Sequence, residues 1–400
     1  MQELYTDALT AWRKNPLAKR IVDITTDYVI GDGITLSSPY SYLNNFIEEF
    51  WYHPENNVPN RLQPMVEELT RSGNYLPILF TNPHDGLSYI RVATVDQLRG
   101  IHNLPNDWET ITQIDIAQYD NLNLAIKPYF TAAATDKPAG DNATISLYTI
   151  NRPEAAHLGE GDLTTVIPWL MRYSRMLEDR IRLNWAVRMF LWFVKVPPGM
   201  VAAKQEQYKS VPEPGTVIVH DDAEEWNLQS PNLHANDASH DLSATRRMVY
   251  SGTGYPPNWY GEQGSNLAEA KASIAPAERH LRRRQLHIID ILRQQALLAY
   301  HLRQKVRGGR KLPISNTQKL ITANTTDLSR EDNAALAEAA ERLSTSYKNL
   351  ILETAPQSRT LTQEILTLFF KFAGEPKEKT TVDRIVDEMF TALEKGTPTP

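Results

Sequence analysis

Residues 251–266 read SGTGYPPNWYGEQGSN and lie between two segments that have the periodicity of long helices. The sixteen residues contain four glycines, two prolines and three large aromatic side chains. Two of the glycines begin a G-x-G pattern, but no strand precedes it and no Lys-Ser/Thr pair follows, which excludes a P-loop. The aromatic residues Tyr255, Trp259 and Tyr260 could stack on nucleic acid bases, or they could pack the loop against its flanking helices.

The segments on either side of this loop have helical apolar spacing. Residues 238–250 precede it and end near Gly252, a common helix terminator. Residues 267–306 follow it and form the longest helical pattern in the chain. One face of that pattern carries Leu267, Ala270, Ile274, Ala277, Leu281, Ile288 and Leu292. Pro276 lies inside the pattern, so we expect a kink there.

A third long helical pattern covers residues 161–194. Asp162 is a candidate N-cap, and Pro168 is compatible with a helix only near its start or at a kink. One face carries Val166, Leu170, Leu177, Ile181 and Trp185. The segment that follows, residues 195–236, is bounded by prolines and is expected to hold a short helix and a strand at 215–219.

The remaining parts of the chain indicate an α+β fold that is predominantly helical. Residues 1–75 have helical spacing, whereas residues 75–160 alternate and are rich in β-branched and aromatic residues. A hairpin turn is expected at residues 82–86 and a strand at residues 143–150. The chain after residue 327 is helical again, which completes a helical C-terminal tail.

The composition limits the classes of function. The chain has 400 residues, of which 41% are hydrophobic and 22% charged, and it carries a net charge of −6 and no cysteine. The acidic balance argues against tight binding of nucleic acid through a basic surface, and the lack of cysteine excludes disulfides and thiolate ligands. No stretch approaches the roughly 18 apolar residues of a membrane span and the N-terminus has no signal-peptide core, so no membrane partner is expected.

Three clusters contain residue types found in catalytic sites. Residues 220–225 hold one histidine and four carboxylates, which would suit a metal-dependent phosphoryl or nucleotidyl transferase, but the spacing favours a solvated acidic turn. The arginines at 282–284 fan around a helix axis, which favours a solvated or intersubunit face over a phosphate site. Ser239, His240 and Asp241 are triad residue types, but neighbours on a helix point apart. We therefore predict no catalytic residue, no metal and no cofactor.

The order of these parts resembles that of the portal protein of tailed bacteriophages. Four segments carry the resemblance: NPLAKRIVDITTDYVIGDGITL at 15–36, GEGDLTTVIPWLMRYSRMLEDRIRL at 159–183, PEPGTVIVHDDAEEW at 212–226, and SGTGYPPNWYGEQGSNLAEAKAS at 251–273. Together with the order of the parts, the resemblance extends over about residues 10 to 375.

The resemblance implies the subunit of a ring, commonly of twelve copies, at one vertex of the capsid. It divides the chain into an α+β wing (1–162), a first stem helix (163–190), a clip (191–237), a second stem helix (238–251), a tunnel loop (252–266), a kinked wing helix with a returning strand (267–326) and a helical crown (327–400).

The family's partners follow from the same resemblance. They are other copies of the chain, the large terminase, a head-completion or adaptor protein, the major capsid and scaffolding proteins, and double-stranded DNA that passes through the channel without sequence-specific contacts. The chain would be made in the host bacterial cytoplasm and located in the virion at the portal vertex. It would not be an enzyme.

Three groups of functional residues are expected on this basis. Tunnel-loop residues facing the DNA channel are Tyr255, Asn258, Trp259, Tyr260, Glu262 and Gln263. Stem residues facing the channel or a neighbouring subunit are Arg172, Arg175, Arg246 and Arg247, for which ion pairs with Glu178, Asp179 or Asp241 are favoured. Clip residues docking a partner are Asp221, Asp222, Glu224 and Glu225.

Overall fold

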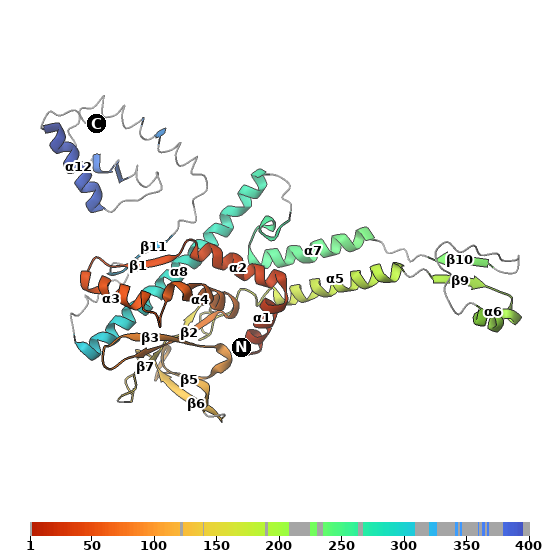
Figure 1. The fold of residues 1–400 in the computed structure, drawn as a ribbon, viewed down its shortest axis with the longest axis horizontal. Helices are drawn as coiled ribbons and strands as arrows, with labels where there is room; N and C mark the ends of the chain where they lie inside the picture. The colour runs from red at the N-terminus through yellow and green to blue at the C-terminus, as the bar shows by residue number, and fades with distance from the viewer. Residues whose placement is uncertain are drawn as a thin grey trace. The chain divides into compact units, whose positions relative to one another are not determined.

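The computed structural model divides into two units, residues 1–324 and 325–400 (Figure 1). It describes residues 2–120, 123–138, 140–188, 191–207, 225–229, 235–262, 267–308 and 320–325. In the second unit it describes residues 379–394 and short pieces between 341 and 367. Helix and strand are both extensive, as expected for an α+β chain rich in helix.

The first unit begins with four helices: α1 (Gln2–Lys14), α2 (Pro16–Ile30), α3 (Ser41–Tyr52) and α4 (Val58–Ser72). The sequence determines where α2 starts, because the Asn15 side chain accepts hydrogen bonds from the backbone N–H groups of Leu17 (2.9 Å) and Ala18 (3.3 Å). Pro16 follows at the first helical position, where its missing N–H costs nothing. Gly31 ends the helix with a positive φ of 54°.

The predicted hairpin is present. Strands β2 (Asn74–Thr81) and β3 (Ser88–Ala93) pair in antiparallel register across the turn at 82–86. The segment predicted as one strand at 143–150 forms two shorter ones, β7 (Ala143–Ile145) and β8 (Tyr148–Thr149), which both pair with β2.

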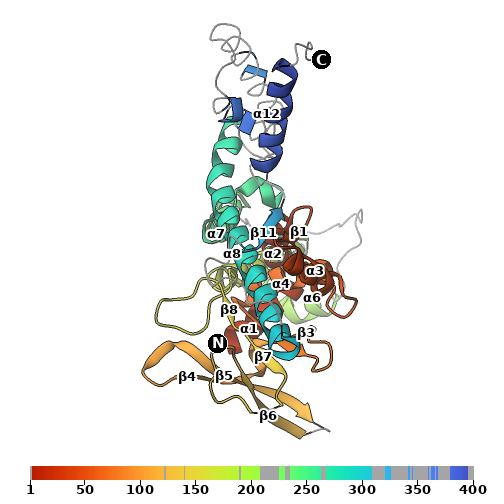
Figure 2. The same cartoon turned by 90° about the vertical axis from the view of Figure 1, so that its left-hand side faces the viewer.

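A second antiparallel sheet consists of β4 (Leu98–Leu104), β5 (Asp107–Asp120) and β6 (Asn123–Phe130), and a short 3-10 helix, η1 (Val95–Gln97), precedes it. Its inner face contributes Ile114, Ile116 and Tyr129 to a core shared with β2, β7 and α1. Figure 2 shows this sheet below β7 and α1.

The long helical patterns end at different residues from those expected. Helix α5 spans Ile167–Arg188 rather than 161–194, and the apolar residues after it form the strand β9 (Leu191–Lys195). Helix α7 spans Ala235–Thr253, so the first residues of the expected loop are helical, and a 3-10 helix, η3 (Pro257–Tyr260), follows. Helix α8 (Leu267–Arg307) runs continuously through Pro276.

Helices α5 and α7 lie side by side and form a helical hairpin (Figure 1). Beyond α5 come β9, a 3-10 helix η2 (Pro198–Met200), a short helix α6 (Val201–Gln207) and β10 (Glu225–Gln229), which pairs antiparallel with β9. The strand expected at 215–219 lies outside the described residues.

Two elements distant in sequence complete the first unit. Strand β1 (Ile34–Ser37) pairs with β11 (Thr322–Thr325), which lies at the end of the segment 267–326 where a returning strand is expected. Helix α8 packs against α2 and α3, and Ala277, Leu281, Ile288 and Leu292 of its predicted apolar face are buried, while Ile274 is half-buried.

The second unit contains one long described helix, α12 (Lys379–Glu394), which was expected at this position. Val382 and Val386 are its buried side chains, and Asp387 forms an ion pair with Arg359.

Candidate functional site

The candidate site is the α5–α7 hairpin and the segment after α7. Residues 159–162, which we call the strap, connect the start of the hairpin to the rest of the first unit. Asn74 binds both backbone groups of Gly159, donating to its carbonyl (2.9 Å) and accepting from its N–H (2.8 Å). The strap passes so close to α4 that a Cβ on Gly161 would lie 2.0 Å from the carbonyl oxygen of Arg71. Any side chain at residue 161 would clash with the α4 backbone, so this close contact between the strap and α4 requires glycine.

Asp162 is an anchor of the strap and not the N-cap of α5. Its Oδ1 accepts from Arg284 Nη2 of α8 (3.0 Å) and from Asn151 Nδ2 (2.6 Å). The Arg284 side chain is 6% exposed, so this is a buried ion pair that joins the strap to α8. The expectation that Asp162 caps the helix is wrong because α5 begins five residues later.

The base of the hairpin is closed by apolar packing. Leu163, Val166 and Leu170 are buried on the α5 side, and Val249 is buried on the α7 side. A Cβ on Gly252 would lie 2.6 Å from Val166 Cγ1, so the end of α7 sits directly against the start of α5.

Tyr255 is buried against α2, with 4% of its surface exposed. Its hydroxyl lies 2.6 Å from Thr25 Oγ1, and Thr25 itself donates to the carbonyl of Ile21 (3.0 Å). Tyr255 is therefore the donor in this pair, and burial raises the pKa of its hydroxyl above the ordinary range. The sequence predicts that Tyr255 faces a channel; in the single chain its ring and its hydroxyl both make contacts within the fold.

The next aromatic residues pack against the flanking helices. Trp259 stacks on Tyr28 of α2 with 4.6 Å between ring centroids, and its carbonyl accepts from Arg20 Nε (3.2 Å). Tyr260 stacks on Tyr250 of α7 with 4.5 Å between centroids. Burial raises the pKa of Tyr260 to about 12. The sequence left two alternatives for these aromatic residues, stacking on bases or packing against the flanking helices. In this conformation they pack against the helices.

Glu262 is tied to α7. It accepts from the Tyr250 hydroxyl (3.0 Å) and forms an ion pair with Arg246 (2.9 Å). Asn258 has a buried Oδ1 without a partner in the described chain, and Gln263 lies outside the described residues. The described part of the predicted tunnel loop is therefore anchored from its first aromatic residue to Glu262.

Two of the four predicted stem arginines contact residues other than the favoured carboxylates. Arg246 pairs with Glu262, Arg172 lies over the Trp169 ring (4.6 Å), and Glu178 pairs with Arg182 instead. Arg175 and Arg247 have no ion-pair partner within the described part of the chain.

The distal half of α5 has an apolar surface that the described residues leave exposed. Leu177, Ile181 and Trp185 are 37%, 57% and 71% exposed. They follow each other at intervals of four residues, so they form one stripe along the helix. We call these three residues the distal stripe. Val166 and Leu170, on the same predicted face, are buried at the base.

The acidic cluster of the predicted clip is largely outside the described residues. Asp221, Asp222 and Glu224 are not described, and Glu225 is the first residue of β10. Among the residues that the structure does describe, no three His, Asp or Glu side chains gather as a metal site would require. The described helices likewise include none with the length and apolarity needed to cross a membrane.

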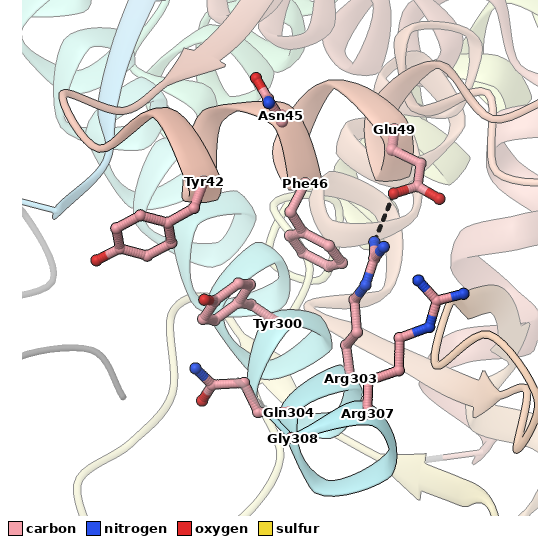
Figure 3. Close-up of a pocket in the computed structure, with 9 residues that line it drawn as sticks. All are labelled: Tyr42, Asn45, Phe46, Glu49, Tyr300, Arg303, Gln304, Arg307 and Gly308. Carbon is pink, nitrogen blue, oxygen red and sulfur yellow. Dashed lines mark hydrogen bonds and ion pairs between the residues drawn. The ribbon is translucent and has the colours of Figure 1, made fainter. Parts of the chain in front are cut away.

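A separate pocket of about 220 Å³ lies between α3 and the end of α8 (Figure 3). Phe46 packs edge-on against Tyr300, with 5.2 Å between centroids, and Arg303 lies over Phe46 and pairs with Glu49. Glu49 therefore balances the charge of Arg303. We interpret these side chains as a packing contact between α3 and α8, and not as a ligand site.

Comparison with solved structures relates this fold to chains of gene transfer agent (GTA) particles. A chain from the neck of an empty GTA particle, computed with C6 symmetry, matches with a TM-score of 0.55 and 12% identity over 93% of this chain and 94% of that chain. The chain shares its fold with a neck chain.

Two further structures agree with this result over the same shares of both chains. A chain of the virion of a native gene transfer agent (GTA) particle matches with a TM-score of 0.54 and 13% identity. A chain from the neck of a native GTA particle, computed with C12 symmetry, matches with a TM-score of 0.54 and 14% identity. No protein-family model and no curated protein matches the chain.

Proposed function

We propose that this chain is the subunit of a portal ring at one capsid vertex, through which double-stranded DNA is packaged and ejected. The observation that carries the proposal is the likeness to a neck chain over 93% of this chain and 94% of the other. A match of nearly equal length on both sides relates whole subunits and not one shared domain. At 12% identity the likeness shows the fold, and the function is our inference from it.

The distal stripe supports self-association. Contiguous exposed apolar surface on a soluble protein commonly marks an interface. Leu177, Ile181 and Trp185 lie on a helix whose base is fixed by the strap, so the stripe is presented in a constant orientation. A neighbouring copy in a ring would cover it. Helix α5 with α7 would then be the stem, and residues 191–237 the clip.

The anchored aromatic residues give the tunnel loop a different role from the one first expected. In the proposed ring, Trp259, Tyr260 and Glu262 hold the loop against α2 and α7, so they fix where the constriction lies. DNA would pass without being held, since twelve copies at −6 each carry about −72 and repel phosphate. Catalysis would belong to a separate terminase.

The first test is the native mass of the purified chain, measured by mass spectrometry with electron microscopy. Twelve copies of 45.4 kDa give a ring of about 0.5 MDa with a central hole. Ile181→Asp should prevent ring formation, because it places a charge in the distal stripe. Leu183→Asp is the matched control, since residue 183 is exposed on the same helix but lies roughly 200° around the axis. A compact dimer without a hole would contradict the proposal.

The second test concerns partner docking at the clip. Replacing Asp221, Asp222, Glu224 and Glu225 together by alanine should weaken binding of terminase or adaptor to the assembled ring. Binding that is unchanged while the ring forms normally would remove these residues from the docking surface.

A further inference from the structure

Two of the three arginines at 282–284 contribute to one pocket of about 260 Å³ between α8 and the end of β8, which we call the α8–β8 pocket. Its lining consists of Thr149, Ile150, Asn151, His280, Arg283, Arg284 and His287. The four basic residues occupy positions i, i+3, i+4 and i+7 of α8, so they lie along one side of the helix. Arg282 is not among them, because its guanidinium donates to Gln285.

Only some of the hydrogen-bond donors of the α8–β8 pocket have an acceptor among the described residues. Arg284 gives one nitrogen, Nη2, to Asp162, while Nη1 is buried and has no acceptor in the described chain. Arg283 is exposed and has no ion pair among the described residues. A buried guanidinium nitrogen without an acceptor is costly, and an anion would remove that cost.

One of the two histidines, His280, can add a donor that carries no charge, whereas the N–H of His287 is already bonded within the fold. His287 Nε2 lies 2.9 Å from the carbonyl of Thr149, which can only accept, so Nε2 carries the proton. His280 is half-buried, and burial together with the charge of Arg284 lowers its pKa, which favours a neutral ring that can donate from one nitrogen.

The charges around the pocket favour a phosphate over a single carboxylate. Asp162 balances the guanidinium of Arg284, which leaves one full positive charge, that of Arg283, in the pocket lining. A carboxylate offers two oxygens, whereas a phosphate offers more acceptors and, as a monoester or free ion, a second negative charge. Arginine is also well suited to phosphate because its planar donors bind two oxygens together.

We propose that the α8–β8 pocket binds a phosphate group, supplied either by free inorganic phosphate or by a DNA backbone. The inference goes beyond the portal proposal and does not require a ring, because every residue of the pocket belongs to one chain. Arg283 makes the outer contact, Arg284 the inner contact, and His280 donates a further hydrogen bond.

The test is calorimetric titration of the full chain with inorganic phosphate at constant ionic strength. We expect saturable binding at one site per chain. Arg283→Gln should weaken it about tenfold, the effect of losing one charge-assisted hydrogen bond. Arg279→Gln is the matched control, because Arg279 is exposed one turn away on α8 and does not line the pocket. It should leave the affinity unchanged.

A second series distinguishes the source of the phosphate and guards against misfolding. A short DNA duplex that displaces phosphate from the wild type but not from Arg283→Gln assigns the site to a DNA backbone; failure to displace it assigns the site to free phosphate. Thermal unfolding of His280→Ala, with and without phosphate, should show a smaller stabilisation by phosphate than in the wild type. Absence of saturable phosphate binding, or equal losses for Arg283→Gln and Arg279→Gln, would overturn the proposal.

Discussion

The base of the α5–α7 hairpin and its distal half are parts of the same two helices, yet their apolar residues have opposite surroundings. At the base, Leu163, Val166 and Leu170 are buried by the strap, α7 and the body of the first unit. Along the distal stripe, Leu177, Ile181 and Trp185 remain exposed. The base is therefore packed within one chain, whereas the distal half has an exposed apolar surface, which in the proposed ring a neighbouring copy would cover.

The largest expected effect comes from crowding the strap at the base. Gly161→Ala would place a methyl group 2.0 Å from the carbonyl oxygen of Arg71, and backbone on both sides leaves little room to move. We expect a loss of about 4 kcal/mol or more in the free energy of unfolding, measured by chemical denaturation. Gly199→Ala, which meets no atom within 4 Å, is the control and should change stability little.

The next effect is the loss of one buried hydrogen bond at the base. Tyr255→Phe removes the donor to Thr25 but keeps the ring, so the free energy of unfolding should fall by about 1 kcal/mol. Tyr52→Phe, at an exposed tyrosine of α3, should have no measurable effect. Equal stability of wild type and Tyr255→Phe would mean that the contact with α2 is not maintained in solution.

A pH effect is expected beside the strap, where Glu68 and Arg71 form a nearly buried ion pair. Burial outweighs the attraction of Arg71 and raises the pKa of Glu68 above its ordinary value of about 4.3. The folded chain then binds the proton more tightly than the unfolded chain. This contribution to stability is full below pH 4 and is lost as pH rises through the raised pKa.

The measurement for Glu68 is the free energy of unfolding between pH 3.5 and 7, for wild type and Glu68→Gln. Glutamine cannot titrate, so the stability of the wild type relative to the variant should decrease as pH rises. A difference that stays constant, or that grows in favour of the wild type, would show that the attraction of Arg71 is the stronger influence.

The smallest effect on the isolated chain is expected at the distal stripe. Ile181→Ala should change the free energy of unfolding by less than about 0.5 kcal/mol, because the side chain is already exposed. Leu170→Ala, at a buried position of the same helix, should cost about 3 kcal/mol. A large loss for Ile181→Ala in a monomer would show that the distal half is covered by its own chain.

Local features of the fold were readable from the sequence. The start of α2 follows from Asn15 and Pro16, and the β2–β3 hairpin follows from the turn residues between two alternating segments. The end of α5 could not be predicted from the sequence, because the apolar run at 189–194 is compatible with a helix and with a strand.

The contacts that define the candidate site were not readable because they join distant residues. Asp162 has the right type for an N-cap, and its partner Arg284 is 122 positions away. Tyr255 and its partner Thr25 are separated by 230 positions. A helix pattern shows that Leu177 and Leu170 share a face, but only the packed structure shows that one is covered and the other is not.

The pairing of β1 with β11 has a consequence for synthesis of the chain. Ser37 and Thr322, which are hydrogen-bonded across this pair, are 285 positions apart. At a translation rate of roughly 5 to 20 residues per second, β1 waits about 15 to 60 s before the ribosome has made its partner. During that interval the strand has an open edge in a crowded cell, where premature pairing between nascent chains competes with correct folding.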